Sequence, residues 1–356
     1  MRVCVFPRSI EGNAVTLLMG DACERAGVRY VRFDWWRHLF QPYEVFHVHW
    51  PDAVVMGRSK MGSLVKFVLF MATVARARAR RETIVYTVHN IGAHDGFHPR
   101  LERLLWKCFL PAVSTFHHMN HWSIDAFVRR FPEVAGARHL VVPHPHYAST
   151  LNLPTRVDAR AVLELSADAR VVLNVGRVRP YKGVEDLIAA FKAHPDPRAV
   201  LLIAGKPLDD TYADALRALA ADDPRIRLDL RFIADAEIDQ LLAACDIVVL
   251  SHAHFNNSGV AVLAVSAGRA VLAPARGSIP DLKVQVGETW VTMYEDALTP
   301  ADLAAALQGV DKTPDTALPD LSAMDPDVIG MRLADIYAGG SGGGQAVEGV
   351  VDVAAT

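Results

Sequence analysis

The stretch from Val171 to Phe191, VVLNVGRVRPYKGVEDLIAAF, decides the fold of this chain. Its first five residues form an apolar, β-branched run, which predicts a buried strand that ends at Gly176. After a short loop, apolar side chains recur at helical spacing at Leu187, Ile188 and Phe191. A strand, a tight loop and a helix in this order are the building unit of a parallel α/β sheet.

The loop between this strand and this helix carries two cations, Arg177 and Lys182. Glu185 and Asp186 follow in the first turn of the helix, where carboxylates favour a helix start. Arginine can hold a diphosphate with two donors and lysine adds a point charge, so the loop suits an anion-binding site. The alternative is an ordinary strand-to-helix turn with two solvated cations.

The motif GRVRPYKG, residues 176–183, resembles the phosphate-gripping motif of GT-B glycosyltransferases of the family 4 kind. The resemblance implies an α/β fold with two Rossmann-like, doubly wound domains that face a cleft. It also implies that Arg177 and Lys182 hold the diphosphate of a nucleotide-sugar donor.

The composition is that of a soluble globular protein with room for two domains. The chain has 356 residues, 51% hydrophobic and 22% charged, and its formal net charge of −3 argues against a nucleic-acid partner. Four cysteines show neither metal-ligand nor disulfide spacing, which suits a reducing cytoplasm. The N-terminus is broken by Pro7 too early for a signal peptide, and no apolar run is long enough to span a bilayer.

Four regions are expected along the chain. Residues 1–150 open with a strand–helix–strand pattern and predict an acceptor-binding domain, and residues 151–320 predict the nucleotide-sugar-binding domain. In the resemblance, the helix within 321–338 returns to the first domain, and the Gly-rich tail 339–356 is expected to be disordered. The triplet Asp325-Pro326-Asp327 is interpreted as a loop and not as a metal-binding DxD, so we expect no metal and no cofactor beyond the nucleotide-sugar co-substrate.

Two places in the first domain are candidates for lining the acceptor site or the cleft. The resemblance places Gly12 and Asn13, in the loop after the first strand, near the donor phosphates and the acceptor. In the strand predicted at 45–50, His47 and His49 face the same side, as core histidines or as active-site lining. We favour His49 and Asp52 for the site, because the carboxyl ends of parallel strands carry the ligand.

A general base is expected in the loop after the strand predicted at 83–89, where His89, His94 and Asp95 lie close in sequence. TVHN followed by a His-acidic pair resembles a motif of bacterial polysaccharide glycosyltransferases, in which the acidic residue is more often Glu. If the reaction inverts, Asp95 is the first candidate for the base and His89 the second. His94 is assigned to the acceptor site or cleft. The alternative is a hydrogen-bonded loop without a catalytic role.

The segment Gly62–Arg81, GSLVKFVLFMATVARARARR, combines an apolar run with a basic end. No acidic residue occurs from Arg58 to Arg81, a pattern typical of a helix that lies in an anionic membrane interface. We therefore expect contact with the inner face of the cytoplasmic membrane through residues 62–81. The alternative is a helix buried against the sheet, with a solvated basic end.

Further donor-binding positions come from the second domain. In the resemblance, the loop at Gly205 and Lys206 and the backbone near Ile233 flank the nucleotide base. Ser258 and Gly259 open a helix whose free N–H groups form a second phosphate site, to which Asn257 can add a donor.

The second domain lacks the pair of glutamates that most family 4 enzymes carry, one for the sugar and one for the ribose. Phe255 and Leu263 stand at these positions. Together with SGV at 258–260, this departure resembles xanthan-type β-mannosyltransferases, which use GDP-mannose and invert. HVHWPD, TVHN and GRVRPYKG extend the similarity over both domains.

The expected function is transfer of a sugar from a nucleotide donor, with GDP-mannose favoured, to a polyprenyl-linked or oligosaccharide acceptor in exopolysaccharide synthesis. A nucleotide-sugar 2-epimerase is an alternative that shares the architecture, but the apolar and basic segment 62–81 argues against it. A non-catalytic protein that keeps the fold is a second alternative, which the missing glutamate pair leaves open.

Overall fold

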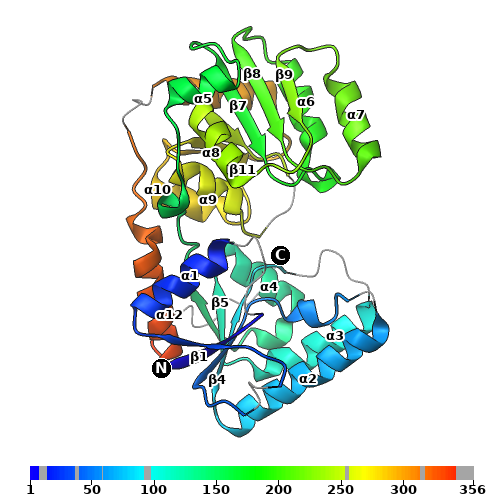
Figure 1. The fold of residues 1–356 in the computed structure, drawn as a ribbon, viewed down its shortest axis with the longest axis vertical. Helices are drawn as coiled ribbons and strands as arrows, with labels where there is room; N and C mark the ends of the chain where they lie inside the picture. Colours follow the sequence, from blue (N-terminus) through cyan, green and yellow to red (C-terminus); the bar gives the residue numbers. More distant parts are fainter. Residues whose placement is uncertain are drawn as a thin grey trace, which may run out of the picture. The chain divides into compact units, whose positions relative to one another are not determined.

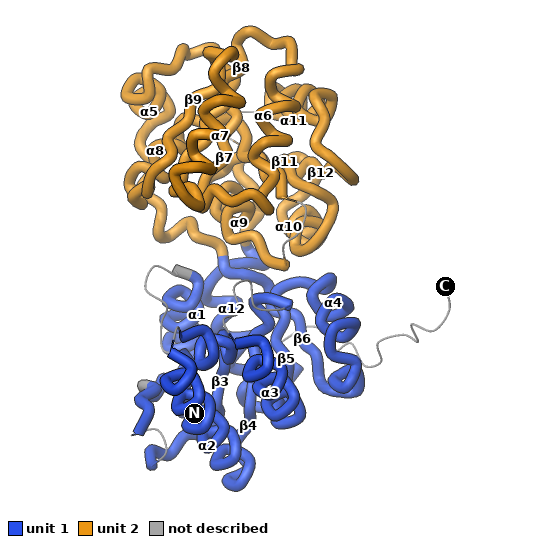
Figure 2. The backbone as a smooth tube through the Cα atoms, turned by 90° about the vertical axis from the view of Figure 1, so that its right-hand side faces the viewer, with its two compact units in different colours: residues 1–145, 322–356 blue, residues 146–321 orange. Residues whose placement is uncertain are grey.

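The computed structural model describes residues 1–7, 14–36, 40–57, 59–91, 98–252, 256–312 and 317–341. The chain forms two compact units, which Figure 2 colours separately. Unit 1 comprises residues 1–145 and the segment from residue 322 on, and unit 2 comprises residues 146–321. Most of the tail predicted at 339–356 lies outside the described residues.

Unit 1 is built on a parallel sheet with the strand order β2-β1-β3-β4-β5-β6. The chain order reverses between β1 and β3, because β2 lies on one side of β1 and the later strands lie on the other. The strands are β1 (Arg2–Phe6), β2 (Arg29–Arg32), β3 (Val45–Val48), β4 (Thr83–Thr87), β5 (Thr115–His118) and β6 (Arg138–Val141). The helices are α1 (Ala14–Arg25), α2 (Lys60–Ala79), α3 (Pro99–Phe109), α4 (Trp122–Arg130) and α12 (Pro326–Tyr337).

The two faces of this sheet carry two separate cores, because successive strand residues point to opposite sides. Val3, Val45 and Val85 pack with apolar residues of α1 and α12. Phe46 and Ile84 point the other way and pack with α2, α3 and α4. Buried strands with apolar side chains on both faces are typical of parallel sheets.

The C-terminal helix α12 packs against α1 (Figure 1). A Cβ added at Gly330 would lie 2.4 Å from the carbonyl oxygen of Ala22, so this approach requires glycine. Asp327 forms an ion pair with Arg25 at 2.5 Å, and the Asp325 carboxylate caps the helix by accepting a 2.8 Å bond from the Asp327 amide. The interpretation of Asp325-Pro326-Asp327 as a loop was therefore wrong, because Asp325 caps α12 and the next two residues are its first turn.

Helix α2 divides its apolar residues between the core and the surface. One face is buried through Ser63, Phe67, Phe70, Thr73, Val74 and Ala77. The other face exposes Met61, Leu64, Val65 and Val68 in the N-terminal half of the helix. Arg76, predicted to belong to a basic end, instead pairs with Glu82 at 2.6 Å and lies 4.3 Å from the centre of the Tyr43 ring. Within the ranges described, no helix is both long enough and apolar enough to cross a membrane.

Unit 2 is a second parallel sheet, with the order β12-β11-β10-β7-β8-β9 and a reversal between β7 and β10. Its strands are β7 (Arg170–Val175), β8 (Ala199–Ala204), β9 (Ile226–Asp229), β10 (Ile247–Val249), β11 (Ala270–Pro274) and β12 (Val291–Tyr294). Its helices are α5 (Arg156–Val162), α6 (Val184–Lys192), α7 (Asp210–Ala220), α8 (Asp235–Ala244), α9 (Gly259–Ser266), α10 (Ile279–Val286) and α11 (Pro300–Asp311). In open sheets of this kind, ligands bind beyond the strand ends at the reversal.

Candidate functional site

The loop between β7 and α6 lies at the reversal point of unit 2. Gly183 adopts a left-handed conformation (φ 62°) just before α6, and a Cβ there would lie 2.5 Å from the carbonyl oxygen of Ser251. The Ser251 hydroxyl donates a 2.7 Å hydrogen bond to the carbonyl oxygen of Lys182. Ser251 follows β10, so the ends of the two strands at the reversal are held together at this loop.

The ammonium group of Lys182 and the first turn of α9 meet at the end of β7. A Cβ added at Gly176 would lie 3.7 Å from the Lys182 Nζ and 3.7 Å from a methyl group of Val260. Ser258 caps α9 by accepting a 3.2 Å bond from the Ala261 amide. The loop with the motif 176–183, here called the phosphate loop, therefore lies beside the predicted helix start. Asn257 and Gly259 are next to the Ser258 cap in sequence.

The loop between β7 and α6 concentrates positive charge. Within the parts of the chain that the structure describes, Arg177 and Lys182 form no ion pair with a carboxylate. Burial and the nearby charges of Arg177 and Arg179 lower the pKa of Lys182 to about 8. Clustered cations repel one another and are stabilised by a nearby anion, so this loop is a candidate anion site.

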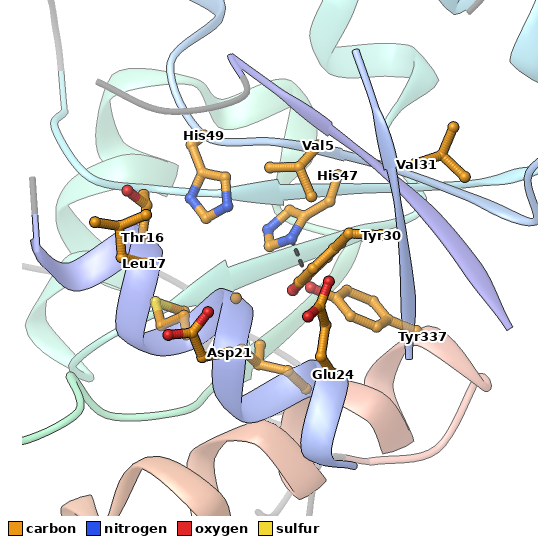
Figure 3. Close-up of a pocket in the computed structure, with 13 residues that line it drawn as sticks. Val5, Thr16, Leu17, Asp21, Glu24, Tyr30, Val31, His47, His49 and Tyr337 are labelled. Atoms are coloured by element: carbon orange, nitrogen blue, oxygen red, sulfur yellow. Dashed lines mark hydrogen bonds between the residues drawn. The ribbon is translucent and has the colours of Figure 1, made fainter. Parts of the chain in front are cut away.

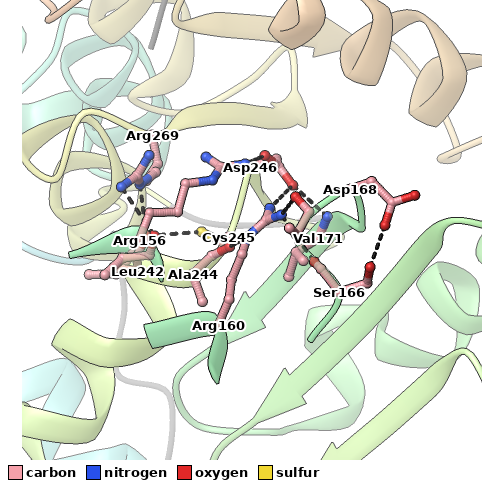
Figure 4. Close-up of polar contacts among 12 residues, drawn as sticks. Arg156, Arg160, Ser166, Asp168, Val171, Leu242, Ala244, Cys245, Asp246 and Arg269 are labelled. Carbon is pink, nitrogen blue, oxygen red and sulfur yellow. Dashed lines mark hydrogen bonds and ion pairs between the residues drawn. The ribbon is translucent and has the colours of Figure 1, made fainter. Parts of the chain in front are cut away.

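Two other arginines of unit 2, Arg156 and Arg160, share one carboxylate. Figure 4 shows Arg156 and Arg160 on the Asp246 carboxylate, with Arg160 Nη2 at 2.9 Å. The same carboxylate accepts a 2.6 Å bond from the Val171 amide at the start of β7. This arginine cluster therefore contains a carboxylate, whereas among the described residues no carboxylate pairs with Arg177 or Lys182.

Gly205 and Lys206 brace the phosphate loop through their backbone. A Cβ at Gly205 would lie 1.6 Å from the Gly176 carbonyl oxygen, so the two strand ends approach more closely than any side chain permits. The Lys206 carbonyl accepts bonds from the Val178 amide at 3.0 Å and the Arg179 guanidinium at 3.1 Å. The Lys206 side chain is exposed, and Ile233 lies buried in the turn before α8. Their role beside a nucleotide base stays a prediction.

His252 is a residue of this site that sequence reasoning missed. It is buried just after β10, and burial and the charge of Lys182 lower the pKa of its imidazole to about 4. The sequence feature that could have indicated His252 is its position just after a predicted strand, which in the sheet lies beside β7.

In unit 1, hydrogen bonds link His47 of β3, Thr87 of β4 and His117 of β5 near the carboxyl ends of these strands. His117 Nε2 donates to the Val142 carbonyl at 3.0 Å, so His117 Nδ1 accepts a 2.8 Å bond from the Thr87 hydroxyl. That hydroxyl accepts from His47 Nε2 at 2.7 Å, which leaves His47 Nδ1 to accept from the Tyr337 hydroxyl at 2.7 Å. The carbonyl at one end thus fixes the proton positions along the chain. His47 belongs to this buried network, which sequence reasoning did not predict.

His49 forms a different pair with His89. His49 Nδ1 lies 2.8 Å from His89 Nε2, and the Trp50 ring stacks on His89 at 4.0 Å. Burial and the nearby imidazole of His117 lower the pKa of His49 to about 3, and burial is also the main cause that lowers the pKa of His89. Both predicted residues therefore come together as neutral imidazoles. Asp52 follows shortly after His49 in sequence, in the short helix Pro51–Val54.

A pocket of about 320 Å³ lies between α1 and the sheet of unit 1, beside the reversal between β1 and β3 (Figure 3). Its polar lining comes from Thr16, Asp21, Glu24, Tyr30, His47, His49 and Tyr337. Gly20 also lines it and leaves open the space in front of the Tyr30 ring. The pocket thus offers hydroxyl, carboxylate and imidazole groups, and His49 is the candidate from the sequence that it includes.

Four predicted site residues, Gly12, Asn13, His94 and Asp95, lie outside the described residues, as does Phe255.

The chain resembles known proteins over most of its length. Residues 169–310 match the family model of glycosyl transferases group 1. Over 301 residues the chain is 30% identical to a GDP-mannose:glycolipid 4-beta-D-mannosyltransferase of Xanthomonas campestris pv. campestris, covering 82% of this chain and 78% of the relative.

Solved structures share its fold. HepE from Anabaena in complex with UDP has a TM-score of 0.62 at 19% identity, with 95% of each chain covered. A glycosyltransferase from Rickettsia africae has a TM-score of 0.64 at 10% identity, with 95% of this chain and 97% of that chain covered. These likenesses confirm the predicted pair of Rossmann-like domains. The chain belongs to the group 1 glycosyl transferases and is a glycosyltransferase with the GT-B fold.

Proposed function

We propose that this glycosyltransferase moves mannose from GDP-mannose to a polyprenyl-linked or oligosaccharide acceptor in exopolysaccharide synthesis, with inversion and without a metal. The observation that carries the proposal is the phosphate loop, where Arg177 and Lys182 have no acidic partner among the described residues. The Xanthomonas relative is a GDP-mannose:glycolipid mannosyltransferase, which supports the choice of donor and of a lipid-linked acceptor.

In this proposal, unit 2 binds the donor and stabilises the leaving diphosphate. Arg177 contributes a planar pair of donors, and Lys182 contributes a charge that is already in place before the reaction. The amides at the start of α9 add dipoles of the same sign. Together these groups supply the charge stabilisation for which other enzymes use a divalent cation.

Unit 1 binds the acceptor and supplies the base that removes its proton, for which Asp95 and His89 are the candidates from the sequence. Inversion requires a single displacement, which needs no enzyme nucleophile. The absence of the glutamate pair supports such a mechanism, because Leu263 stands at one of its positions and has no carboxylate.

We also propose that the enzyme works on the inner face of the cytoplasmic membrane. The surface concerned, here called the α2–α3 face, consists of exposed Met61, Leu64, Val65, Val68 and Leu104 with Lys60, Lys66, Arg100, Arg103 and Lys107 around them. Helices α2 and α3 run next to each other in Figures 1 and 2, and a groove between their N-terminal ends is lined by Lys60, Leu64 and Arg100. Apolar side chains rimmed by cations suit an anionic bilayer surface.

Titration calorimetry of GDP and UDP without divalent cations tests the donor assignment. We expect GDP to bind more tightly than UDP, and we expect Arg177→Ala to weaken GDP binding by at least about tenfold through loss of a charge-assisted contact. Arg217→Ala is the matched control, because Arg217 is an exposed cation of the same unit that pairs with Asp214 on α7. Equal binding of GDP by the wild type and by Arg177→Ala would refute the assignment of the phosphate loop.

A further inference from the structure

The histidines of unit 1 differ in whether their ring nitrogens are committed to protein partners. In the chain from Tyr337 to Val142, both nitrogens of His47 and of His117 are used. A second buried pair behaves in the same way. His139 Nε2 donates to the Val134 carbonyl at 2.9 Å, so His139 Nδ1 accepts from His118 at 3.0 Å. None of these four imidazoles has a lone pair to offer to a substrate.

His49 is arranged differently. Its Nδ1 bonds to His89 Nε2, and its ring lines the pocket beside Thr16, close to the His47 ring at 4.2 Å (Figure 3). No protein partner is found for its Nε2 within the described residues. The Trp50 ring holds the plane of His89 by stacking, which in turn fixes the direction of the bond to His49.

The chemistry of the pocket suits a sugar hydroxyl. The carboxylates of Asp21 and Glu24 at its rim form no ion pair with any described cation, so their oxygens can accept from hydroxyl groups. Tyr30 adds a hydroxyl and an aromatic surface. A neutral sugar ring can donate hydrogen bonds from its hydroxyl groups to these acceptors and brings no charge of its own into the pocket.

We infer that His49 accepts the proton of the acceptor hydroxyl and that His89 is the residue that positions it. The inference rests on the proposed sugar transfer and changes the order of candidates for the base, because it places His49 ahead of both Asp95 and His89. The inference requires that in the ground state His49 carries its proton on Nδ1 and donates a hydrogen bond to His89 Nε2. The lone pair of His49 Nε2 then faces the pocket.

The step balances as a single displacement. The acceptor O–H bond breaks, and its proton moves to His49 Nε2. The freed oxygen forms a bond to the anomeric carbon of the donor, and the bond from that carbon to the diphosphate oxygen breaks with its electron pair. The nucleoside diphosphate leaves, and the imidazolium of His49, stabilised through its bond to His89, returns its proton to solvent.

The tautomer of His49 tests the inference without any substrate. Long-range ¹⁵N–¹H correlation spectra of the ¹⁵N-histidine-labelled full chain report which ring nitrogen carries the proton, and His49→Gln assigns the signals. We expect the Nδ1–H form for His49 and the Nε2–H form for His117 and His139, whose carbonyl partners require it. An Nε2–H form of His49 would leave no lone pair toward the pocket and would overturn the inference.

Kinetics supply a second test, with octyl glucoside as a glycolipid probe and GDP release from GDP-mannose as the readout. We expect His49→Ala to lower kcat by about 100-fold or more with unchanged GDP affinity, and we expect added imidazole to restore part of the rate. His89→Ala should lower kcat less and gain nothing from imidazole. His139→Gln is the matched control, because it alters a buried histidine pair that does not line the pocket.

The outcomes separate this inference from the proposed function. A wild type that binds GDP and releases it from GDP-mannose, together with a His49→Ala variant of equal kcat, would refute the role of His49 alone. A wild type that binds neither GDP nor UDP would refute the donor assignment, whereas the tautomer of His49 would still decide the inference about its lone pair.

Discussion

The Ser251 hydroxyl donates a 2.7 Å hydrogen bond to the Lys182 carbonyl oxygen and thereby ties the end of β10 to the loop that follows β7. The two residues are far apart in sequence but meet because β7 and β10 are neighbours in the sheet. This bond anchors the backbone of Lys182, while the Lys182 side chain reaches the end of β7.

Gly183→Ala should disrupt the junction of β10 with the phosphate loop. A Cβ would lie 2.5 Å from the Ser251 carbonyl oxygen, and φ of 62° adds a left-handed strain of about 1 kcal/mol for alanine. We expect GDP affinity to fall by about tenfold or more and the thermal midpoint to drop, as measured by calorimetry. Gly309→Ala is the control, because nothing lies within 4 Å of its added Cβ. Unchanged GDP affinity of Gly183→Ala would show that the loop position is not important for binding.

Donor binding should weaken at alkaline pH because of Lys182. Its pKa is about 8 without nucleotide, and a bound diphosphate raises that pKa. Binding is therefore strongest below pH 8 and is lost as pH rises through the pKa of the complex. Calorimetry in buffers of different ionisation enthalpy should detect proton uptake near pH 8. Lys182→Arg, whose charge does not titrate in this range, should flatten the dependence, and a profile as steep as that of the wild type would exclude Lys182 as its source.

The α2–α3 face should bind anionic vesicles. We expect sedimentation with phosphatidylglycerol vesicles, weaker binding with added salt, and no binding to phosphatidylcholine alone. Changing exposed Val65 and Val68 together to serine should weaken partition by about tenfold, because the apolar area that enters the interface is lost. Val284→Ser on α10 is the control, since Val284 is equally apolar and 87% exposed in unit 2. Equal partition of the two variants would contradict the assigned surface.

Asp246→Ala should destabilise unit 2 without acting on the donor directly. Arg160 is 5% exposed and would keep its bonds to backbone carbonyls but lose its carboxylate, and an uncompensated buried charge costs about 3 kcal/mol. Urea unfolding should report this loss, and GDP binding by the remaining folded protein should be unchanged. Arg217→Ala removes an exposed pair of the same unit and should leave stability nearly unchanged. If both variants unfold at the same urea concentration, the cluster in Figure 4 contributes little to stability.

The sequence alone was enough to predict the repeating strand–loop–helix pattern and the two cations of the phosphate loop. These features are local, because hydrophobic period and turn residues are read within a single stretch of chain such as 171–191. The resemblance added the GT-B architecture, which structural comparison confirmed. Less regular elements, such as α10 and β12, were not predicted because their patterns are short.

Only the tertiary structure decided which side chains meet. The sequence gives no sign that the Tyr337 hydroxyl, on the last helix, bonds to His47, or that the Val142 carbonyl fixes the protons of two histidines. It also could not divide the apolar residues of α2 between a buried face and an exposed face. Contacts of this kind depend on strand order and on helix approach, as at Gly330 and Ala22, and these arise from packing between distant segments and not from local pattern.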